Sequence, residues 1–213
     1  MELTPQLLLH AYSLGIFPMS EGRDSRDLFW MDPPMRGIFP LDGFRISKSL
    51  GKAIARAEYQ ITLNRDFEGV VEGCAERDET WISRKIQSAY VKLHEMGHVQ
   101  SLEVWRGGSL IGGIYGVSLG AAFFGESMFS RQTNASKIAL AYLVTHLRNC
   151  GFTLFDTQYL TPHLASLGAI EIRRDAYQAL LEQAVVQPEK FHKRAYPPSV
   201  SDVLQRNTQT SYL

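Results

Sequence analysis

Apolar residues recur every three or four positions in seven segments of the chain, a spacing that places them on one face of a helix. Several of these segments begin at a residue type that caps helices, such as Thr4, Ser83 and Thr161, and glycine follows the last apolar position of four of them. The predicted helices span about 5–14, 47–57, 66–75, 83–96, 134–150, 161–167 and 175–185.

Alternation of apolar and polar residues, together with runs of β-branched and aromatic side chains, predicts strands at about 59–63, 99–105, 110–117, 121–129, 152–158 and 170–174. Short turns such as RGGS at 106–109 join the second, third and fourth of these strands, so we expect an antiparallel meander. A meander followed by helix, strand and helix predicts an α/β or α+β domain with a mixed sheet.

The segment from Gly15 to Gly43 interrupts this pattern. It is rich in Pro, Gly, Asp and Met, which predicts irregular structure, and a long loop with several apolar side chains is usually functional. We therefore expect residues 1–35 to form a small N-terminal lobe and residues 36–213 to form the larger domain.

Composition narrows the class of protein without selecting a function. The 213 residues are 45% hydrophobic, enough to bury a core, and 22 basic residues balance 22 acidic ones. A net charge of zero argues neither for nor against a nucleic-acid partner. Cys74 and Cys150 lie far apart and form no disulfide framework or metal motif. Since no signal peptide or bilayer-length apolar run is apparent, we expect a soluble cytoplasmic protein.

The stretch HEMGH, from His94 to His98, matches the H-E-x-x-H pattern of zinc hydrolases, in which two histidines on one helix face bind the metal. Gly97 lies between these histidines, and glycine ends helices because it adopts left-handed backbone angles without a clash. The second histidine then falls beyond the helix, and no third ligand stands at a recognisable spacing. We expect a helix end here and no metal site.

Two stretches place polar residues among apolar ones. Glu126, in FFGESMFSR, lies at a predicted strand end, where a carboxylate must be paired or take part in binding; an ion pair with Arg131 is the structural alternative. Asp156 and Gln158 stand two apart on a predicted strand, so both point to one face and together could orient an amine and a carbonyl. The alternative is a strand end at which Asp156 binds backbone.

A basic stripe, formed by Arg45, Lys48, Lys52 and Arg56, lies at the second predicted helix. The four residues stand three or four positions apart with no acidic residue among them, so a helix presents them on one face. Most such stripes are solvated surfaces. In a chain of zero net charge, however, a stripe of one sign is a candidate contact for a phosphate backbone.

In these stretches and around them the chain resembles the bacterial leucyl/phenylalanyl-tRNA–protein transferases. The matching segments are AYSLGIFPM, FWMDPPMRGIF, the run from VVEGCAERDETWI to GGIYGV, FFGESMFSRQTNASKIAL and FDTQYLTPHLASLGAIEIRR, which cover nearly the whole chain in order. The G-E-S-M-F-S-R…N-A-S-K and E-G-C…T-W-I…L-H-E-M-G-H patterns are long and specific. In that family the equivalent of HEMGH lies between a helix and a strand and binds no metal.

The resemblance implies an enzyme that moves Leu or Phe, and less readily Met, from aminoacyl-tRNA to the α-amino group of a protein beginning with Arg or Lys. The new N-terminal residue marks the product for proteolysis as an N-degron. A GNAT-like acyltransferase domain is implied, in a cytoplasmic monomer that uses no cofactor and no membrane. The alternative is an acyl-CoA-dependent N-acyltransferase on the same fold, but the helix start RQTNAS lacks the glycines that would hold a pyrophosphate.

The resemblance also assigns catalytic roles. Asp156 would hold and help to deprotonate the attacking amine, while Gln158 would relay the proton or donate to the developing oxyanion. Assistance from the terminal hydroxyl of the tRNA stays open. Glu126 matches the carboxylate that binds the basic side chain of the acceptor.

Binding roles follow in the same way. The pocket for the transferred side chain matches Ile114, Phe123, Met128, Leu140 and Leu143. Trp81 and Tyr12 match aromatic residues near the terminal adenosine, where they would stack on the base, and the basic stripe would hold the acceptor stem through its phosphates. Met19 stands where family members often carry Trp, so stacking there is lost or replaced by a softer apolar contact.

Overall fold

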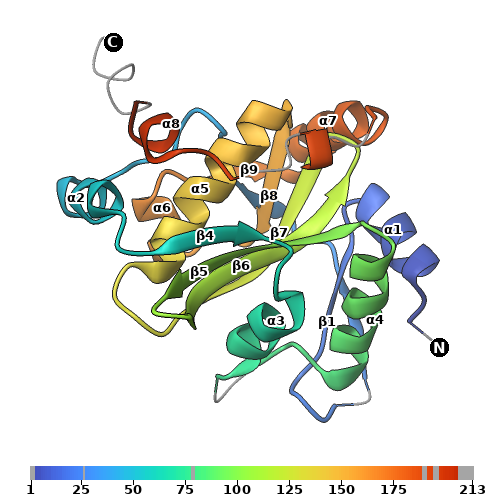
Figure 1. Ribbon diagram of the computed structural model, residues 1–213. Coiled ribbons are helices and arrows are strands. Elements are labelled where there is room, and N and C mark those ends of the chain that lie inside the picture. The colour runs from blue at the N-terminus through green and yellow to red at the C-terminus, as the bar shows by residue number, and fades with distance from the viewer. Residues whose placement is uncertain (1–2, 26, 78–79, 189–190, 194–196, 206–213) are drawn as a thin grey trace.

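The computed structural model describes residues 3–25, 27–77, 80–188, 191–193 and 197–205 (Figure 1). A mixed sheet runs through the centre, in the order β4 (Gln60–Leu63), β5 (Val99–Arg106), β6 (Ser109–Leu119), β7 (Ala122–Ser130), β8 (Leu154–Gln158), β3 (Met35–Ile38) and β9 (Ile170–Arg173). Strands β7 and β8 pair in parallel, and the other pairs within this sheet are antiparallel. The predicted α/β class with a mixed sheet, and the meander of β5, β6 and β7, are confirmed.

Helices cover both faces of the sheet and so create two apolar cores. The first core lies under α1 (Pro5–Ser13), α3 (Phe67–Ala75), α4 (Arg84–Glu95) and α7 (Arg174–Val185), and the second under α2 (Lys48–Arg56), α5 (Ala135–Cys150), α6 (Pro162–Ser166) and α8 (Val200–Leu204) (Figure 1). Neighbouring residues Phe123 and Phe124 of β7 belong to different cores, because successive side chains of a strand point to opposite faces. Helix α5 supplies the long crossover that the parallel pair β7 and β8 requires.

The segment between Gly15 and Gly43 is more regular than its sequence predicts. Strand β1 (Phe17–Met19) pairs with β2 (Phe29–Met31), and β3 enters the main sheet between β8 and β9. The prediction of irregular structure is wrong for these strands, since runs of three or four residues are too short for alternation to show. The sequence pattern also missed α8 and the short 3-10 helix at Phe191–Lys193.

Residues of α1 share the first core with the main sheet. Leu8 and Tyr12 are fully buried and pack in one cluster with Tyr115 of β6 and Phe124 of β7. The division of the chain into lobes at residue 35 stays a prediction.

The HEMGH stretch forms a helix end, as predicted. Helix α4 ends at Glu95, Gly97 has a φ of +82°, and β5 begins at Val99. The His94 ring stacks on Phe67 with centroids 4.3 Å apart, and its Nδ1 lies 2.8 Å from the Val99 carbonyl. Over the described ranges, no group of three or more His, Cys, Asp or Glu side chains is arranged to hold a metal ion. No helix in the described part is both long and apolar enough to cross a membrane.

Two glycine substitutions test this account of the helix end. A Cβ at Gly97 would meet no atom within 4 Å, so Gly97→Ala should cost about 1 kcal/mol of unfolding free energy through backbone strain alone. A Cβ at Gly51 inside α2 would make only an ordinary 3.6 Å contact with Ile46, so Gly51→Ala should stabilise the fold by about 0.5–1 kcal/mol. Urea unfolding measures both changes. Effects of the same sign would contradict the left-handed helix end.

Candidate active site

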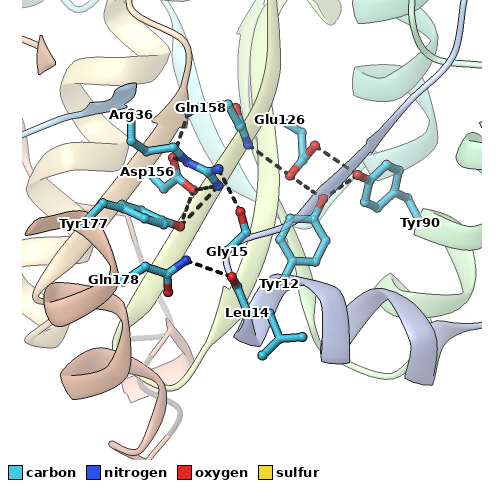
Figure 2. Close-up of polar contacts among 10 residues, drawn as sticks. All are labelled: Tyr12, Leu14, Gly15, Arg36, Tyr90, Glu126, Asp156, Gln158, Tyr177 and Gln178. Atoms are coloured by element: carbon cyan, nitrogen blue, oxygen red, sulfur yellow. Dashed lines mark hydrogen bonds and ion pairs between the residues drawn. The ribbon is translucent and has the colours of Figure 1, made fainter. Parts of the chain in front are cut away.

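A buried ion pair joins β3 to β8. The side chain of Arg36 is 1% exposed and that of Asp156 is 0% exposed. Arg36 Nε donates to Asp156 Oδ1 at 2.9 Å and Nη2 donates to Oδ2 at 2.6 Å, a bidentate arrangement (Figure 2). Because both groups lose their hydration on burial, such a pair is favourable only when the remaining donors and acceptors are also matched.

Other segments supply those partners. Arg36 Nη1 donates to the carbonyl of Gly15 at 2.7 Å, and its guanidinium lies over the rings of Phe17 and Tyr177, at 4.7 Å and 4.4 Å from their centroids. The Tyr177 hydroxyl donates to Asp156 Oδ2 at 2.8 Å. Burial raises the pKa of Tyr177, and the Asp156 charge raises it further, so this hydroxyl stays protonated as a donor. The pair therefore ties the N-terminal segment, the sheet and α7 together.

Asp156 also fixes the backbone of Gln158. The Gln158 N–H donates to Asp156 Oδ1 at 2.8 Å, and Gln158 has a φ of +56°, in the left-handed region that residues other than glycine rarely adopt. This conformation costs about 1–2 kcal/mol and persists where surrounding contacts impose it, often at functional sites. Gln158 Nε2 lies 3.4 Å from Glu126 Oε1 (Figure 2).

Two tyrosine hydroxyls hold Glu126. Tyr12 donates to Oε1 at 2.6 Å and Tyr90 to Oε2 at 2.9 Å, and the two hydroxyls lie 2.6 Å from each other (Figure 2). Burial raises the pKa of the Glu126 carboxyl to about 7, although the tyrosine hydrogen bonds lower it. Burial and the Glu126 charge raise the pKa of both tyrosines, which keeps them protonated. Near neutral pH the protonated and ionised forms of the Glu126 carboxyl are therefore both populated.

Glu126 and Gln158 both line a cavity of about 360 Å³. Part of its wall is apolar and consists of Ile114, Met128, Leu140 and Phe155. A cavity with apolar walls and a few convergent polar groups is the usual form of a small-molecule site. The other lining residues are Phe17, Pro18, Met19, Arg77, Trp81, Gly125, Ser127, Thr157, Tyr159, Thr161, His163 and Leu164.

The five residues predicted for an apolar pocket fall into two groups. Ile114, Met128 and Leu140 line the cavity. Phe123 and Leu143 are each 1% exposed, pack in the second core and are not among the lining residues. Phe123 lies edge-on to the ring of Phe155 with centroids 5.5 Å apart, so it supports the cavity wall from behind.

Of the two predicted stacking residues, one is accessible. Trp81 lines the cavity and is half-buried. The prediction that Tyr12 stacks on a base is wrong, because this side chain is 0% exposed and its ring packs on Phe124 at 4.9 Å. Its hydroxyl binds Glu126 instead.

Asp156 and Gln158 lie in different environments. Gln158 lines the cavity, whereas Asp156 is fully buried and its oxygens accept hydrogen bonds from Arg36, Tyr177 and the Gln158 N–H. Direct contact between Asp156 and a substrate amine therefore has no geometric support in this structure.

The basic stripe lies outside the cavity. Lys48, Lys52 and Arg56 lie on α2, Arg45 precedes its capping residue, and all four side chains are exposed. Helix α2 packs against the second core through Leu50 and Ile54, which leaves the basic side chains in solvent. A nucleic-acid contact through the stripe would therefore form at a separate surface.

Sequence reasoning missed three residues of the site: Arg36, Tyr90 and Tyr177. Arg36 and Asp156 are 120 positions apart, so no local pattern connects them. The available signal was a single basic residue in the apolar run MRGIF. Tyr90 fitted the apolar face of its helix, and its hydroxyl gave no periodic signal.

Comparison with known proteins identifies the family. The family model described as leucyl/phenylalanyl-tRNA protein transferase matches residues 38–182, and a model described as the N-terminal domain of the same family matches residues 1–34. The chain belongs to the leucyl/phenylalanyl-tRNA–protein transferase family. The resemblance predicted from the sequence is thus confirmed.

Curated members of this transferase family match almost the whole chain. The transferase of Ruegeria pomeroyi is 58% identical, over 99% of this chain and 100% of that protein. The transferase of Cereibacter sphaeroides is also 58% identical, over 98% of this chain and 98% of that protein. Among solved structures, FemX matches with a TM-score of 0.48 and 14% identity over 83% of this chain and 71% of that chain. A ribosomal-protein-alanine N-acetyltransferase from Brucella melitensis matches with a TM-score of 0.38 and 14% identity over 51% of this chain and 86% of that chain. At this level of similarity neither structure informs the function of the chain.

Replacing Arg36 by Met in this transferase should lower the free energy of unfolding by about 3–5 kcal/mol, because Asp156 stays buried without its cation. The double variant R36M/D156N should recover part of this loss, since it leaves no unpaired charge. Arg173→Met, which removes an exposed ion pair with Asp175, should change stability by less than about 0.5 kcal/mol. Equal losses for the two single variants in urea unfolding would contradict the importance of the buried pair.

Proposed function

We propose that the protein transfers Leu or Phe, and less readily Met, from aminoacyl-tRNA to the α-amino group of a protein that begins with Arg or Lys. The observation that carries this proposal is a cavity in which an apolar wall adjoins a carboxylate and an amide, in a member of this transferase family. We place the reaction in the cytoplasm, in a monomer, and expect the new N-terminal residue to mark the product as an N-degron.

The apolar wall suits the transferred side chain. Burying a Leu, Phe or Met side chain against Ile114, Leu140 and Phe155 is favourable by about 1.5–3 kcal/mol. Met128 adds a flexible thioether that adapts to side chains of different shape. Such a pocket discriminates among apolar side chains by only a few kcal/mol, which accounts for the tolerance of all three. Trp81 lies on the wall of the same cavity, and we assign it to stack on the terminal adenine.

The reaction exchanges an ester for an amide. The neutral α-amine nitrogen of the acceptor attacks the ester carbonyl carbon. The bond from that carbon to the ribose oxygen of the terminal adenosine then breaks, and its electron pair stays on the oxygen. The amine loses one proton and the ribose oxygen gains one, so the exchange balances without a further reactant. Holding the amine in line with the carbonyl can supply several kcal/mol of the barrier.

Gln158 is the polar side chain that we assign to the reacting carbonyl. Its amide lies in the cavity, and an N–H aimed at the developing oxyanion stabilises the tetrahedral intermediate. We assign Asp156 as a positioning residue, since its oxygens are occupied and one of them fixes the Gln158 backbone. The proton of the amine is then relayed to the leaving ribose oxygen through the ribose hydroxyl beside the ester or through a water molecule, which gives up one proton as it takes one.

Glu126 is the group that we assign to the acceptor. Each carboxylate oxygen can accept two hydrogen bonds. Oε1 accepts from Tyr12 and Gln158, whereas Oε2 accepts from Tyr90 and keeps capacity for a guanidinium or ammonium group. A cation bound there favours the ionised carboxylate and lowers its pKa from the value of about 7 that burial imposes. A neutral acceptor side chain would gain no such interaction.

Transfer of radiolabelled Leu from Leu-tRNA to a protein that begins with Arg tests the proposal. Gln158→Ala should lower kcat by about 100-fold, the usual effect of losing an oxyanion donor. Glu126→Gln should raise the KM of the acceptor by about tenfold, since a neutral amide cannot replace the charge-assisted hydrogen bond to its cation. Glu68→Gln, at an exposed position on α3, is the matched control. No label at the acceptor N-terminus, while the tRNA stays charged, would disprove the transfer.

Acceptor binding should weaken as the pH falls below about 7. Glu126 loses its charge in this range because burial raises its pKa to about 7, while an acceptor α-amine with a pKa of about 8 stays protonated. Between pH 7.0 and 5.5 the Kd of an Arg-beginning peptide, measured by calorimetry, should rise about tenfold in the wild type. The Kd of Glu126→Gln should stay level. The same pH dependence in both proteins would exclude Glu126 as the acceptor carboxylate.

A further inference from the structure

A second hollow, which we call the basic groove, lies beside the candidate cavity. Its volume is about 360 Å³, and its lining includes Arg77, Met128, Ser130, Arg131, Ser136 and His163. Three of these, Arg77, Met128 and His163, also line the cavity, so the two hollows adjoin. Part of the wall comes from FSRQTNASK, a stretch whose polar side chains the proposed reaction does not use.

The lining of the basic groove contains two arginines, Arg77 and Arg131, and one carboxylate, Glu76. Arg131 is paired with Glu76 at 2.8 Å, so these two charges cancel. Arg77 is exposed, and no carboxylate of a described residue lies within ion-pair distance of it or of Lys137. Burial lowers the pKa of His163, and the positive charge of Lys137 lowers it further. Arg77 in the lining, and Lys137 next to the lining residue Ser136 in the chain, are therefore basic groups here that pair with no described carboxylate.

The groove is held in shape by hydrogen bonds at both ends. Arg77 Nη2 donates to the Met128 carbonyl at 2.5 Å, which fixes the guanidinium where cavity and groove meet. Ser130 Oγ donates to the Gln132 carbonyl at 2.7 Å and accepts from the Ser136 N–H at 3.2 Å, which orders the connection between β7 and α5. A site ordered before binding loses less conformational entropy when it takes a ligand.

We propose that the basic groove binds the phosphodiester backbone of the single-stranded 3′ end of the donor tRNA, at the nucleotides before the terminal adenosine. The inference rests on the proposed function. With the aminoacyl group and terminal adenosine in the cavity, the strand must leave through an opening, and Arg77 stands where the groove adjoins it. Guanidinium and ammonium groups bind phosphate oxygens by charge-assisted hydrogen bonds.

The same charge argues against the acceptor protein as the occupant. An acceptor that begins with Arg or Lys carries positive charge at the end that enters the site, and the like charges of Arg77 and Lys137 repel it. The basic stripe on α2 would serve a different part of the donor, the double-stranded stem. A short donor that lacks the stem therefore isolates the contribution of the groove.

Two short donors test the proposal by transfer kinetics. Leucyl-adenosine has no phosphodiester, whereas the leucylated trinucleotide CCA has two. In the wild type the trinucleotide should have the lower KM. Arg77→Gln and Lys137→Gln should each cut this KM advantage by about fivefold, because glutamine brings no positive charge to the phosphate. Arg173→Gln, which removes an exposed guanidinium outside both hollows, should leave the advantage unchanged.

A binding measurement with fluorescently labelled CCA trinucleotide that carries no amino acid tests this inference separately from the proposed function. The variant R77Q/K137Q should bind it about tenfold more weakly, and the salt dependence should fall by about 0.7 in log–log slope for each phosphate that the protein no longer neutralises. If binding weakens in this way in a protein that never transfers Leu, the groove binds the trinucleotide as proposed and the proposed function is wrong. Unchanged binding together with an unchanged KM advantage would contradict the proposed role of the groove. A raised KM for the acceptor protein instead would also contradict it.

Discussion

The ion pair between Arg36 and Asp156 determines the geometry of the candidate site. Both side chains are buried, and a buried charge that loses its partner costs several kcal/mol. The surrounding segments therefore have to pack around both charges in one arrangement. The Gly15 carbonyl, the ring of Phe17 and the hydroxyl of Tyr177 complete this closure from far apart in the sequence. As a result β1 is held at the cavity, and the strand β8 ends in the left-handed turn that presents Gln158.

Two carboxylates in one site are thereby given different properties. Asp156 is matched by a cation, a hydroxyl and a backbone N–H, an arrangement that suits a fixed structural anion. Glu126 is matched by neutral hydroxyls and an amide, and burial raises its pKa to about 7. A carboxylate on the wall of a cavity that forms no ion pair with a described residue is suited to bind a cation brought by a substrate.

Signals from neighbouring residues in the sequence predicted the helices and strands whose ends depend on those residues. Helix caps, the glycine at position 97 and alternation in the meander gave the helix ends and β5–β7, because each signal lies within a few residues of the feature it predicts. Pairing across the sheet has no such signal, so β3 and Arg36 were missed. Polar residues among apolar ones indicated Glu126 and Gln158, and resemblance to the family added Trp81, but neither could show that Tyr12 is fully buried. Burial is a property of the whole fold.

A double-mutant cycle on the rate of Leu transfer tests most directly whether Arg36 acts through Gln158. Arg36→Lys keeps a buried charge but loses the bidentate geometry, and Gln158→Ala removes the amide. We expect kcat to fall by about tenfold and about 100-fold respectively, and the double variant to be no slower than Gln158→Ala alone. A double variant slowed by the product of the two effects would show that Arg36 and Gln158 act independently, which contradicts a positioning role for the buried ion pair.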